Sequence, residues 1–349
     1  MIDQIRKDLQ AAIDAYVFPG CVAGVYFRNR SHVIALGRLT YDSDSPPVTE
    51  ETIYDVASIT KAIPVSSLAL KLLNDRFISA SDQLVRYLPQ FNGSYREKIL
   101  VQHLLTQTLS FKFRLSDCKD MQSDGIMQKI LTADFGYPPG ACFSYANATS
   151  ILLGLMLERC IGKSLDQAAA EYFFEPLAMK RTSFNVSKFD SNIIAPTEID
   201  SWRGKLIQGE VHDESAWALR PKAVGSAGLF STVPDLLIFI QMLIEEGTYA
   251  GKRFFNPETI NQMCTNQLSG KDLWTGLGWE LNHKSFMGKF CSESAFGKTG
   301  FTGCSVVIDP LKKAGIVLLS NHTYPRRRSN RDTINEIRCK LADNVWKGL

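Results

Sequence analysis

The 349-residue chain has no apolar run close to the roughly 18 residues that a membrane-spanning helix needs. Residues 1–8 carry acids and no apolar core segment of the kind found in a secretory signal. The eight cysteines contain no Cys-x-x-Cys pair and no dense framework, which favours reduced thiols. These absences predict a cytoplasmic protein without a membrane anchor.

Sequence signatures of several other chemistries are also missing. The five histidines show no His-Glu-x-x-His spacing, so we expect no metal site. The chain has no Gly-x-Gly-x-x-Gly and no Walker loop, so we expect no nucleotide and no other cofactor. The Gly-x-Ser-x-Gly elbow of Ser-His-Asp hydrolases is absent, because Val224 stands where its first glycine is required.

The charge balance does not indicate a polyanionic partner. Lys and Arg number 39 against 36 Asp and Glu, a net charge of +3. We therefore expect a small-molecule or peptide substrate, and neither nucleic acid nor a membrane surface. The one basic run, Arg326-Arg327-Arg328, is typical of a solvated loop. Nothing in the sequence indicates the oligomeric state.

Two hairpin patterns near the ends of the chain enclose a helical middle. Alternating segments 21–27 and 32–36 predict one hairpin with its turn at 28–31, and segments 304–308 and 315–319 predict another. Residues 76–220 are mainly helical and loop-rich in pattern. We expect one catalytic domain over 1–349, of α/β (α+β) class. Its antiparallel sheet, flanked by helices, comes from residues 1–75 plus 221–349, with 76–220 as a helical insertion.

Periodic apolar residues predict helices over 5–16, 55–75, 99–106, 150–160, 235–246 and 333–346, and a short strand over 278–281. Pro64 lies inside the second of these helices. Because proline has no N–H to donate, it is tolerated only near a first turn, so this helix should begin close to Ser58.

The first motif with catalytic potential is Ser58-Ile59-Thr60-Lys61. Residues three apart share a helix face, so the Ser58 hydroxyl and the Lys61 amine can meet. A serine hydroxyl needs a neighbouring base, and a lysine can be that base where burial or positive charge lowers its pKa. A second match, Ser116-x-x-Lys119, lies in a polar stretch with no apolar helix behind it, so we disregard it.

Two further triplets follow in the chain. Tyr145-Ala146-Asn147 offers a phenol that can relay a proton beside lysines, and an amide that can orient a substrate. Lys298-Thr299-Gly300 offers a positive charge, a hydroxyl and a glycine that permits close backbone approach. Each triplet alone is a weak signal.

Together, the order and spacing of these motifs resemble the serine β-lactamase and penicillin-binding-protein superfamily, in particular its class C-like branch. That branch includes D-alanyl-D-alanine peptidases and esterases, and the resemblance covers nearly the whole chain. Supporting segments are 101–108, 143–154, 175–179, 211–216, 225–235, 297–309 and 318–325.

The resemblance implies a role for each motif residue. Ser58 is then the nucleophile, Lys61 and Tyr145 transfer the protons, and Asn147 orients the substrate. Lys298, Thr299 and Gly300 bind a substrate carboxylate or polarise the site, and the backbone N–H groups of Ser58 and Phe301 form the oxyanion hole.

The substrate class stays open at this point. A true Lys-Thr-Gly favours substrates with a carboxylate, such as β-lactams or peptides ending in a D-amino acid. The expected cytoplasmic location favours a carboxylesterase without β-lactamase activity. A non-catalytic peptide-binding or scaffold protein is the alternative of another class. His212 and Asp213 are expected to be structural.

Overall fold

A computed structural model describes residues 1–268, 270 and 273–349. Its centre is a six-stranded sheet in the order β2-β1-β12-β11-β10-β9, with every neighbouring pair antiparallel. The strands are β1 (Gly20–Phe27), β2 (Arg30–Gly37), β9 (Glu280–Leu281), β10 (Phe296–Thr299), β11 (Ser305–Asp309) and β12 (Ala314–Ser320).

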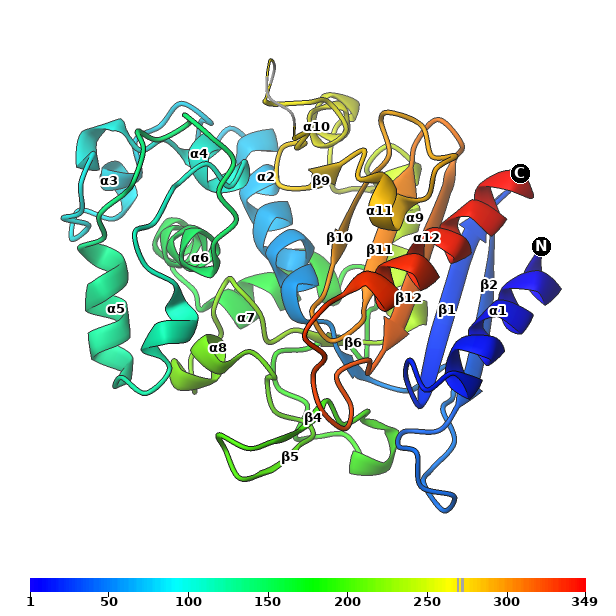
Figure 1. Cartoon of the computed structure of the whole chain (residues 1–349). Helices are drawn as coiled ribbons and strands as arrows, with labels where there is room; N and C mark the ends of the chain where they lie inside the picture. Colours follow the sequence, from blue (N-terminus) through cyan, green and yellow to red (C-terminus); the bar gives the residue numbers. More distant parts are fainter. Residues whose placement is uncertain (269, 271–272) are drawn as a thin grey trace.

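Both ends of the chain build this sheet, as expected. The first strand, β1, pairs with the last, β12, in a register that sets Cys21 opposite Ser320 and Phe27 opposite Ala314. The predicted fold class, an antiparallel sheet flanked by helices with a mainly helical insertion, is therefore confirmed (Figure 1).

Strand periodicity explains how the sheet buries both faces. Along β1, Val22 and Tyr26 enter one apolar cluster, whereas Ala23 and Val25 enter the other, because successive side chains point to opposite faces. Helix α9 (Val233–Ile244) packs on the first face, against β1 and β12. Helices α1 (Ile2–Asp14), α11 (Lys284–Met287) and α12 (Asp332–Lys347) cover the second face (Figure 1).

The helical region lies beside the sheet, around the buried helix α6 (Asn147–Ile161) (Figure 1). Its other helices are α2 (Ser67–Asn74), α3 (Leu84–Tyr87), α4 (Val101–Leu105), α5 (Ser123–Leu131), α7 (Leu165–Ala169) and α8 (Glu214–Ala218). The remaining α-helix is α10 (Pro257–Met263), and the described residues also contain short 3₁₀ and π-helical turns and three two-stranded ladders. The ladders are β3 (Tyr54–Asp55) with β6 (Phe230–Ser231), β4 (Glu198–Asp200) with β5 (Lys205–Ile207), and β7 (Thr248–Tyr249) with β8 (Lys252–Arg253).

The prediction of one helix over 55–75 is wrong. The segment is a 3₁₀ turn, η1 (Ala57–Lys61), then a π-helical turn, η2 (Ala62–Ser66), and only then α2. Ile63 interrupts the run with φ −114° and ψ 112°. The cause is Pro64, because the ring of a proline disfavours the helical conformation at the preceding residue.

Within residues 1–268, 270 and 273–349, no helix has both the length and the apolar character needed to cross a membrane. All eight cysteines are free thiols.

Candidate active site

Ser58 lies on η1, directly after strand β3, where two backbone pairings fix the chain. Strand β3 pairs with β6, and the Val56 N–H donates to the Leu229 carbonyl at 3.0 Å. The hydroxyl of Thr60 then donates to the Ala57 carbonyl at 2.6 Å and accepts from the Leu229 N–H at 3.1 Å. The turn that carries Ser58 is thus held on both sides.

The residue before Ser58 has a strained backbone. Ala57 has φ +48°, a left-handed conformation that costs a non-glycine residue on the order of 1 kcal/mol. The buried carboxylate of Asp55 supports it by accepting the Ala57 N–H at 2.8 Å and the His212 N–H at 2.7 Å. Burial raises the pKa of Asp55, and these two hydrogen bonds oppose the rise. Asp55 therefore shapes the approach to Ser58.

Lys61 meets Ser58 as the Ser-x-x-Lys spacing predicts. Its Nζ donates to Ser58 Oγ at 3.0 Å and to the carbonyl oxygen of Ser226 at 2.6 Å. The side chain is buried, with 4% of the residue exposed. The Ser226 carbonyl therefore orients the ammonium group towards the serine hydroxyl.

Tyr145 reaches the same hydroxyl from the helical region. It precedes α6, and Gln107 fixes its backbone from both sides. The Gln107 carbonyl accepts the Ser144 N–H at 2.7 Å, and its side-chain oxygen accepts the Ala146 N–H at 3.2 Å. The residue Tyr145 as a whole is 45% exposed, but its phenol group is buried and hydrogen-bonds the Ser58 hydroxyl.

Two lysines flank the phenol ring. Lys61 Nζ is 5.2 Å and Lys298 Nζ 4.5 Å from the ring centroid. Burial of the phenol raises its pKa, but the positive charges of Lys298 and Lys61 and the hydrogen bond with Ser58 outweigh this. The pKa of Tyr145 is therefore below its usual value.

Lys298, on β10, is buried and forms an ion pair with Glu280 on β9. Burial lowers its pKa, but the charge of Glu280 and the interaction with Tyr145 raise it, and the net direction is upward. Lys298 is therefore a stable cation beside the phenol. Glu280 was not singled out from the sequence; it follows Trp279 on the short strand predicted over 278–281.

The turn after β10 carries Phe301. The Gly300 N–H donates to the Cys304 carbonyl at 2.7 Å, and the Gly303 N–H to the Gly300 carbonyl at 3.2 Å. In the described part of the chain, the backbone N–H groups of Ser58 and Phe301 have no protein acceptor. Both are thus free to donate to a ligand, and η1 contacts β10.

A buried arginine from the other side of the sheet supports this turn. Arg338, on α12, donates to the Gly300 and Cys304 carbonyls, each at 2.8 Å. Burial lowers the pKa of its guanidinium to about 10. Within the described residues, no carboxylate forms an ion pair with Arg338, so the turn is its main partner. The sequence contains no local signal for this contact.

Asn147 and Thr299 lie where the triplets predict them, with one difference. The Asn147 amide donates to Asp213 Oδ2 at 3.0 Å and to Ser215 Oγ at 3.4 Å. Its N–H₂ group is therefore partly committed to the loop before α8. Thr299 ends β10 with its side chain partly exposed.

His212 and Arg327, the middle residue of the basic run, meet at Glu198. His212 contacts Glu198 Oε2 at 2.8 Å and stacks on Phe301 with ring centroids 5.6 Å apart. Arg327 pairs with Glu198 at 2.7 Å and Glu214 at 2.5 Å. The basic run lies in a loop with Arg326 and Arg328 exposed, as predicted, whereas Arg327 is partly buried and held by two acids distant in sequence.

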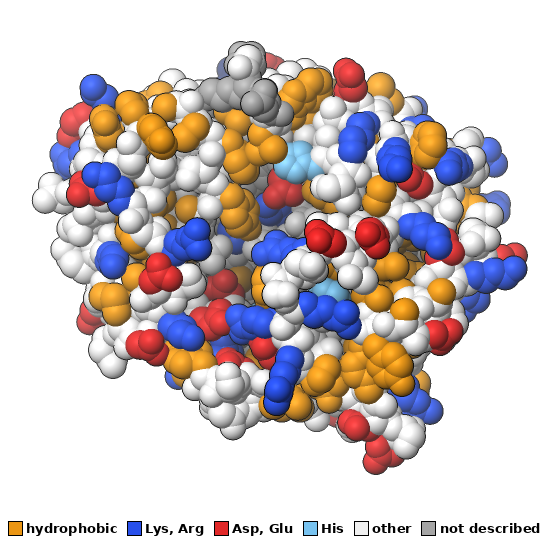
Figure 2. Space-filling view, viewed as in Figure 1, with side chains coloured by type: hydrophobic (Ala, Val, Ile, Leu, Met, Phe, Trp, Pro, Cys, Tyr) orange, Lys and Arg blue, Asp and Glu red, His pale blue; other side chains and the backbone are white. Residues whose placement is uncertain are grey.

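The motifs thus meet where the helical region and the sheet adjoin, and Figure 2 shows this face hollowed there, with both acidic and basic side chains in the hollow. A small cavity beside Lys61, Tyr145 and Lys298 has a volume of about 20 Å³, enough for about one water molecule. Leu105, Phe143, Thr275 and Trp279 are among its other lining residues. Over the described ranges, no cluster of three or more His, Cys, Asp or Glu side chains is arranged to hold a metal ion.

Known proteins are similar to this chain in sequence or in fold. A protein provisionally named D-alanyl-D-alanine carboxypeptidase, from Escherichia coli (strain K12), is 29% identical over 307 residues, which cover 79% of this chain and 70% of that protein. The structure of EstCE1, "a hydrolase with promiscuous acyltransferase activity", superposes with a TM-score of 0.76 at 19% identity, over 97% of this chain and 98% of that one. Unliganded simvastatin synthase (LovD) from Aspergillus terreus superposes with a TM-score of 0.78 at 16% identity, over 99% and 98%.

The two structural likenesses concern the fold alone. The family comparison extends further, because the profile of the family described as Beta-lactamase matches residues 5–338. That span includes the Ser-x-x-Lys, Tyr-x-Asn and Lys-Thr-Gly motifs and Arg338. The chain belongs to the beta-lactamase family of serine hydrolases.

Proposed function

We propose that this protein hydrolyses an ester or amide through an acyl-enzyme on Ser58, with Lys61 and Tyr145 transferring the protons. One observation carries the proposal: the Ser58 hydroxyl contacts both Lys61 and Tyr145, which come from segments far apart in the chain. A purely structural serine has no need for two titratable partners. One of these partners, Tyr145, also lies beside the ion pair of Lys298 and Glu280.

The contacts suggest which group takes the first proton. Lys61 donates to Ser58 Oγ and to the Ser226 carbonyl, so it holds the serine hydroxyl in position for attack. The pKa of Tyr145 is lowered by its lysine neighbours, which favours a phenolate. Tyr145 then accepts the Ser58 proton as Oγ attacks the carbonyl carbon, and returns it to the leaving group.

The developing oxyanion needs two donors. The free N–H groups of Ser58 and Phe301 meet this requirement, since such donors stabilise charge that appears only in the transition state. Water then attacks the acyl-enzyme. The water-sized cavity beside Lys61, Tyr145 and Lys298 supports this hydrolytic step, because a water there is adjacent to both proposed proton carriers, Lys61 and Tyr145.

Two substrate classes each have an observation in their favour. Lys298, followed by Thr299 and Gly300, favours a carboxylate-bearing substrate such as a D-amino-acid peptide or a β-lactam, in line with the name of the E. coli relative. The ion pair of Lys298 with Glu280 favours a neutral ester, because that acid already balances the lysine charge. We place the neutral ester first.

A substrate panel with a matched pair of variants tests the proposal. Purified protein is offered p-nitrophenyl acetate and butyrate, a D-Ala-D-Ala peptide and nitrocefin, with intact mass measured for an adduct on Ser58. We expect Ser58→Ala to lower ester hydrolysis by roughly a thousandfold or more, about 4 kcal/mol. Ser116→Ala should leave it unchanged, because that second Ser-x-x-Lys serine contacts only Asp117. Equal rates in wild type and Ser58→Ala, without an adduct, favour the non-catalytic binding protein.

A further inference from the structure

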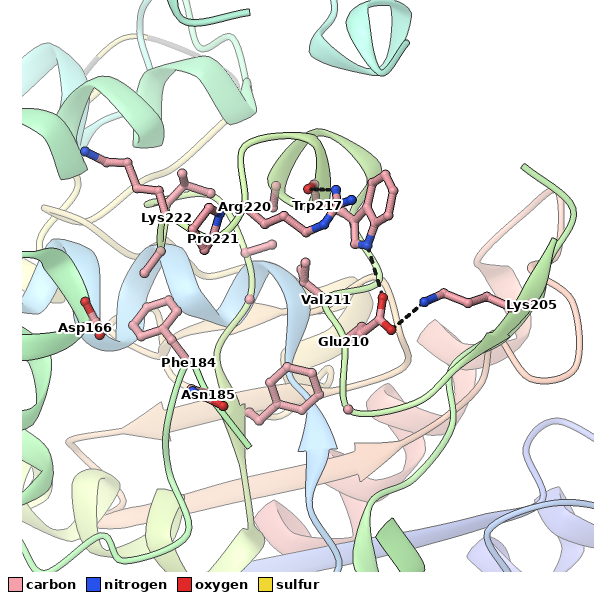
Figure 3. Close-up of a pocket in the computed structure, with 17 residues that line it drawn as sticks. Asp166, Phe184, Asn185, Lys205, Glu210, Val211, Trp217, Arg220, Pro221 and Lys222 are labelled. Carbon is pink, nitrogen blue, oxygen red and sulfur yellow. Dashed lines mark hydrogen bonds and ion pairs between the residues drawn. The ribbon is translucent and has the colours of Figure 1, made fainter. Parts of the chain in front are cut away.

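A second cavity lies against helix α8. Its volume is about 480 Å³, within the usual range of small-ligand sites. Figure 3 shows its lining side chains, which come from α7 and the segment after it, the strand β5 region, α8 and the chain that follows α8. We call it the α8 cavity; its principal walls are Phe184, Val211, Trp217, Arg220, Val224 and Phe230.

The lining combines polar and apolar surface in about equal parts. Lys205 pairs with Glu210 at 2.5 Å, and Glu210 also accepts the Trp217 indole N–H at 3.1 Å (Figure 3). Lys222 pairs with Glu158 at 2.6 Å. Two charged lining residues, Asp166 and Arg220, have no ion-pair partner among the described residues, and Arg220 is the cation of the two.

Arg220 presents unused donors at this edge. Its guanidinium lies over the Trp217 ring, 3.2 Å from the centroid, and donates one N–H to the Trp217 carbonyl at 2.7 Å. Among the residues that the structure describes, no carboxylate forms an ion pair with Arg220. A guanidinium has five N–H donors in a planar fork, and the indole restricts the orientation of this one.

We propose that the α8 cavity binds a small carboxylate with an aromatic or branched aliphatic body. The carboxylate pairs with Arg220, and the body lies against Phe184, Val211 and Phe230. Two observations support this class: Arg220 is a cation without an ion-pair partner among the described residues, and Phe184, Val211 and Phe230 offer apolar surface for the body of the ligand.

Two segments of the chain, α8 and residues 224–227, line the α8 cavity and also contact residues of the catalytic site. On α8, Ala216 and Trp217 line the cavity, whereas Ser215, with the preceding Asp213, contacts Asn147. Val224 and Ala227 line the cavity as well, and between them the Ser226 carbonyl accepts from Lys61 at 2.6 Å. A ligand in the cavity therefore acts on the groups that place Asn147 and Lys61. This coupling rests on the proposed function, whereas the binding does not.

Binding is tested by calorimetry with 4-phenylbutanoate and its neutral analogue 4-phenylbutanamide. We expect the carboxylate to bind wild type at millimolar or lower concentration, and the amide roughly tenfold more weakly. Arg220→Gln should lose this preference, and Ala223→Phe, which fills the cavity, should lose binding. Lys222→Gln is the matched control, because it removes an already paired charge, and it should bind as wild type does. No binding to wild type, or equal binding of acid and amide, overturns the proposal.

The location is tested with protein that has no free catalytic serine. Ser58→Ala should bind 4-phenylbutanoate with unchanged affinity; loss of binding there places the ligand at Ser58 instead and overturns the proposal. In wild type, saturating 4-phenylbutanoate should change kcat for p-nitrophenyl butyrate by more than roughly twofold without a competitive rise in KM. An unchanged kcat refutes the coupling. A protein that binds the carboxylate but hydrolyses no ester refutes the proposed function and not the cavity.

Discussion

Replacing Lys298 by methionine should move the pH dependence of the reaction upwards. The reaction as proposed needs Tyr145 as a phenolate, and the Lys298 ammonium is the largest of the charges that lower the pKa of this phenol. Without it the phenol holds its proton to higher pH. The acid limb of the kcat/KM profile, which follows that pKa in the free enzyme, should therefore rise.

The distance sets the size of this shift. Lys298 Nζ is 4.5 Å from the Tyr145 ring centroid, and two unit charges about 4 Å apart interact by roughly 4 kcal/mol at an effective dielectric constant near 20. That energy corresponds to about three pKa units. Because 45% of Tyr145 is exposed, solvent screens part of it, and we expect a rise of about one to two units.

A double variant separates this electrostatic effect from a direct contact with substrate. In Lys298→Met the Glu280 carboxylate loses its ion-pair partner and raises the Tyr145 pKa further. Lys298→Met/Glu280→Gln removes both charges, so its acid limb should lie between those of wild type and the single variant. The profiles are measured with p-nitrophenyl butyrate, which has no carboxylate. Coinciding acid limbs in wild type and Lys298→Met refute the reasoning.

Three other substitutions test separate parts of the structure. Arg338→Met should lower the acylation rate constant roughly tenfold in single-turnover kinetics. The free energy of unfolding in urea should fall by no more than about 2 kcal/mol, because the Gly300 and Cys304 carbonyls each keep a backbone donor. Trp346→Phe, elsewhere on α12, should leave the acylation rate constant unchanged. Gly300→Ala sets a Cβ 2.4 Å from a backbone oxygen next to η1 and should abolish ester hydrolysis, whereas Gly204→Ala, with open space around its Cβ, should not. Burial raises the pKa of Glu198, but the hydrogen bonds with His212 and Arg327 lower it by more, so it is about 2 in the folded protein against 4.5 in the unfolded chain. This difference contributes up to about 3 kcal/mol of stability, which is complete above pH 4.5 and is lost as the pH falls towards 2. Glu198→Gln should show no such loss in chemical unfolding across that window.

Local patterns predicted most strands of the sheet and failed for the segment after Ser58. Segments 21–27, 32–36, 304–308 and 315–319 predict strands, because each is a short, β-rich run bounded by turn residues. The apolar spacing after Ser58 matches a helix equally well, and only the conformation imposed by Pro64 breaks it at Ile63. Strand β10 was not predicted, because four residues are too few to show a period.

The residues of the candidate site also fall into those that a local motif predicts and those that no local motif predicts. The motifs name Ser58, Lys61 and Tyr145, since short spacing or a known order brings these residue types together. Glu280 and Arg338 are invisible in the sequence, because each acts on the site across a strand pairing or from a distant helix. A contact between elements that no local pattern relates can be found only from the fold.

The pairing of the first strand with the last also determines when the chemistry becomes available during synthesis. A ribosome completes Ser58 and Lys61 long before Lys298, and β1 has no partner on its β12 side until residues 314–320 have emerged. A chain that ends before residue 298 therefore carries Ser58 without Lys298 beside the phenol and without the turn that holds Phe301. A chain that ends before the final helix contains both, but it lacks Arg338, which supports this turn. The reactivity proposed for Ser58 thus depends on segments that are synthesised late.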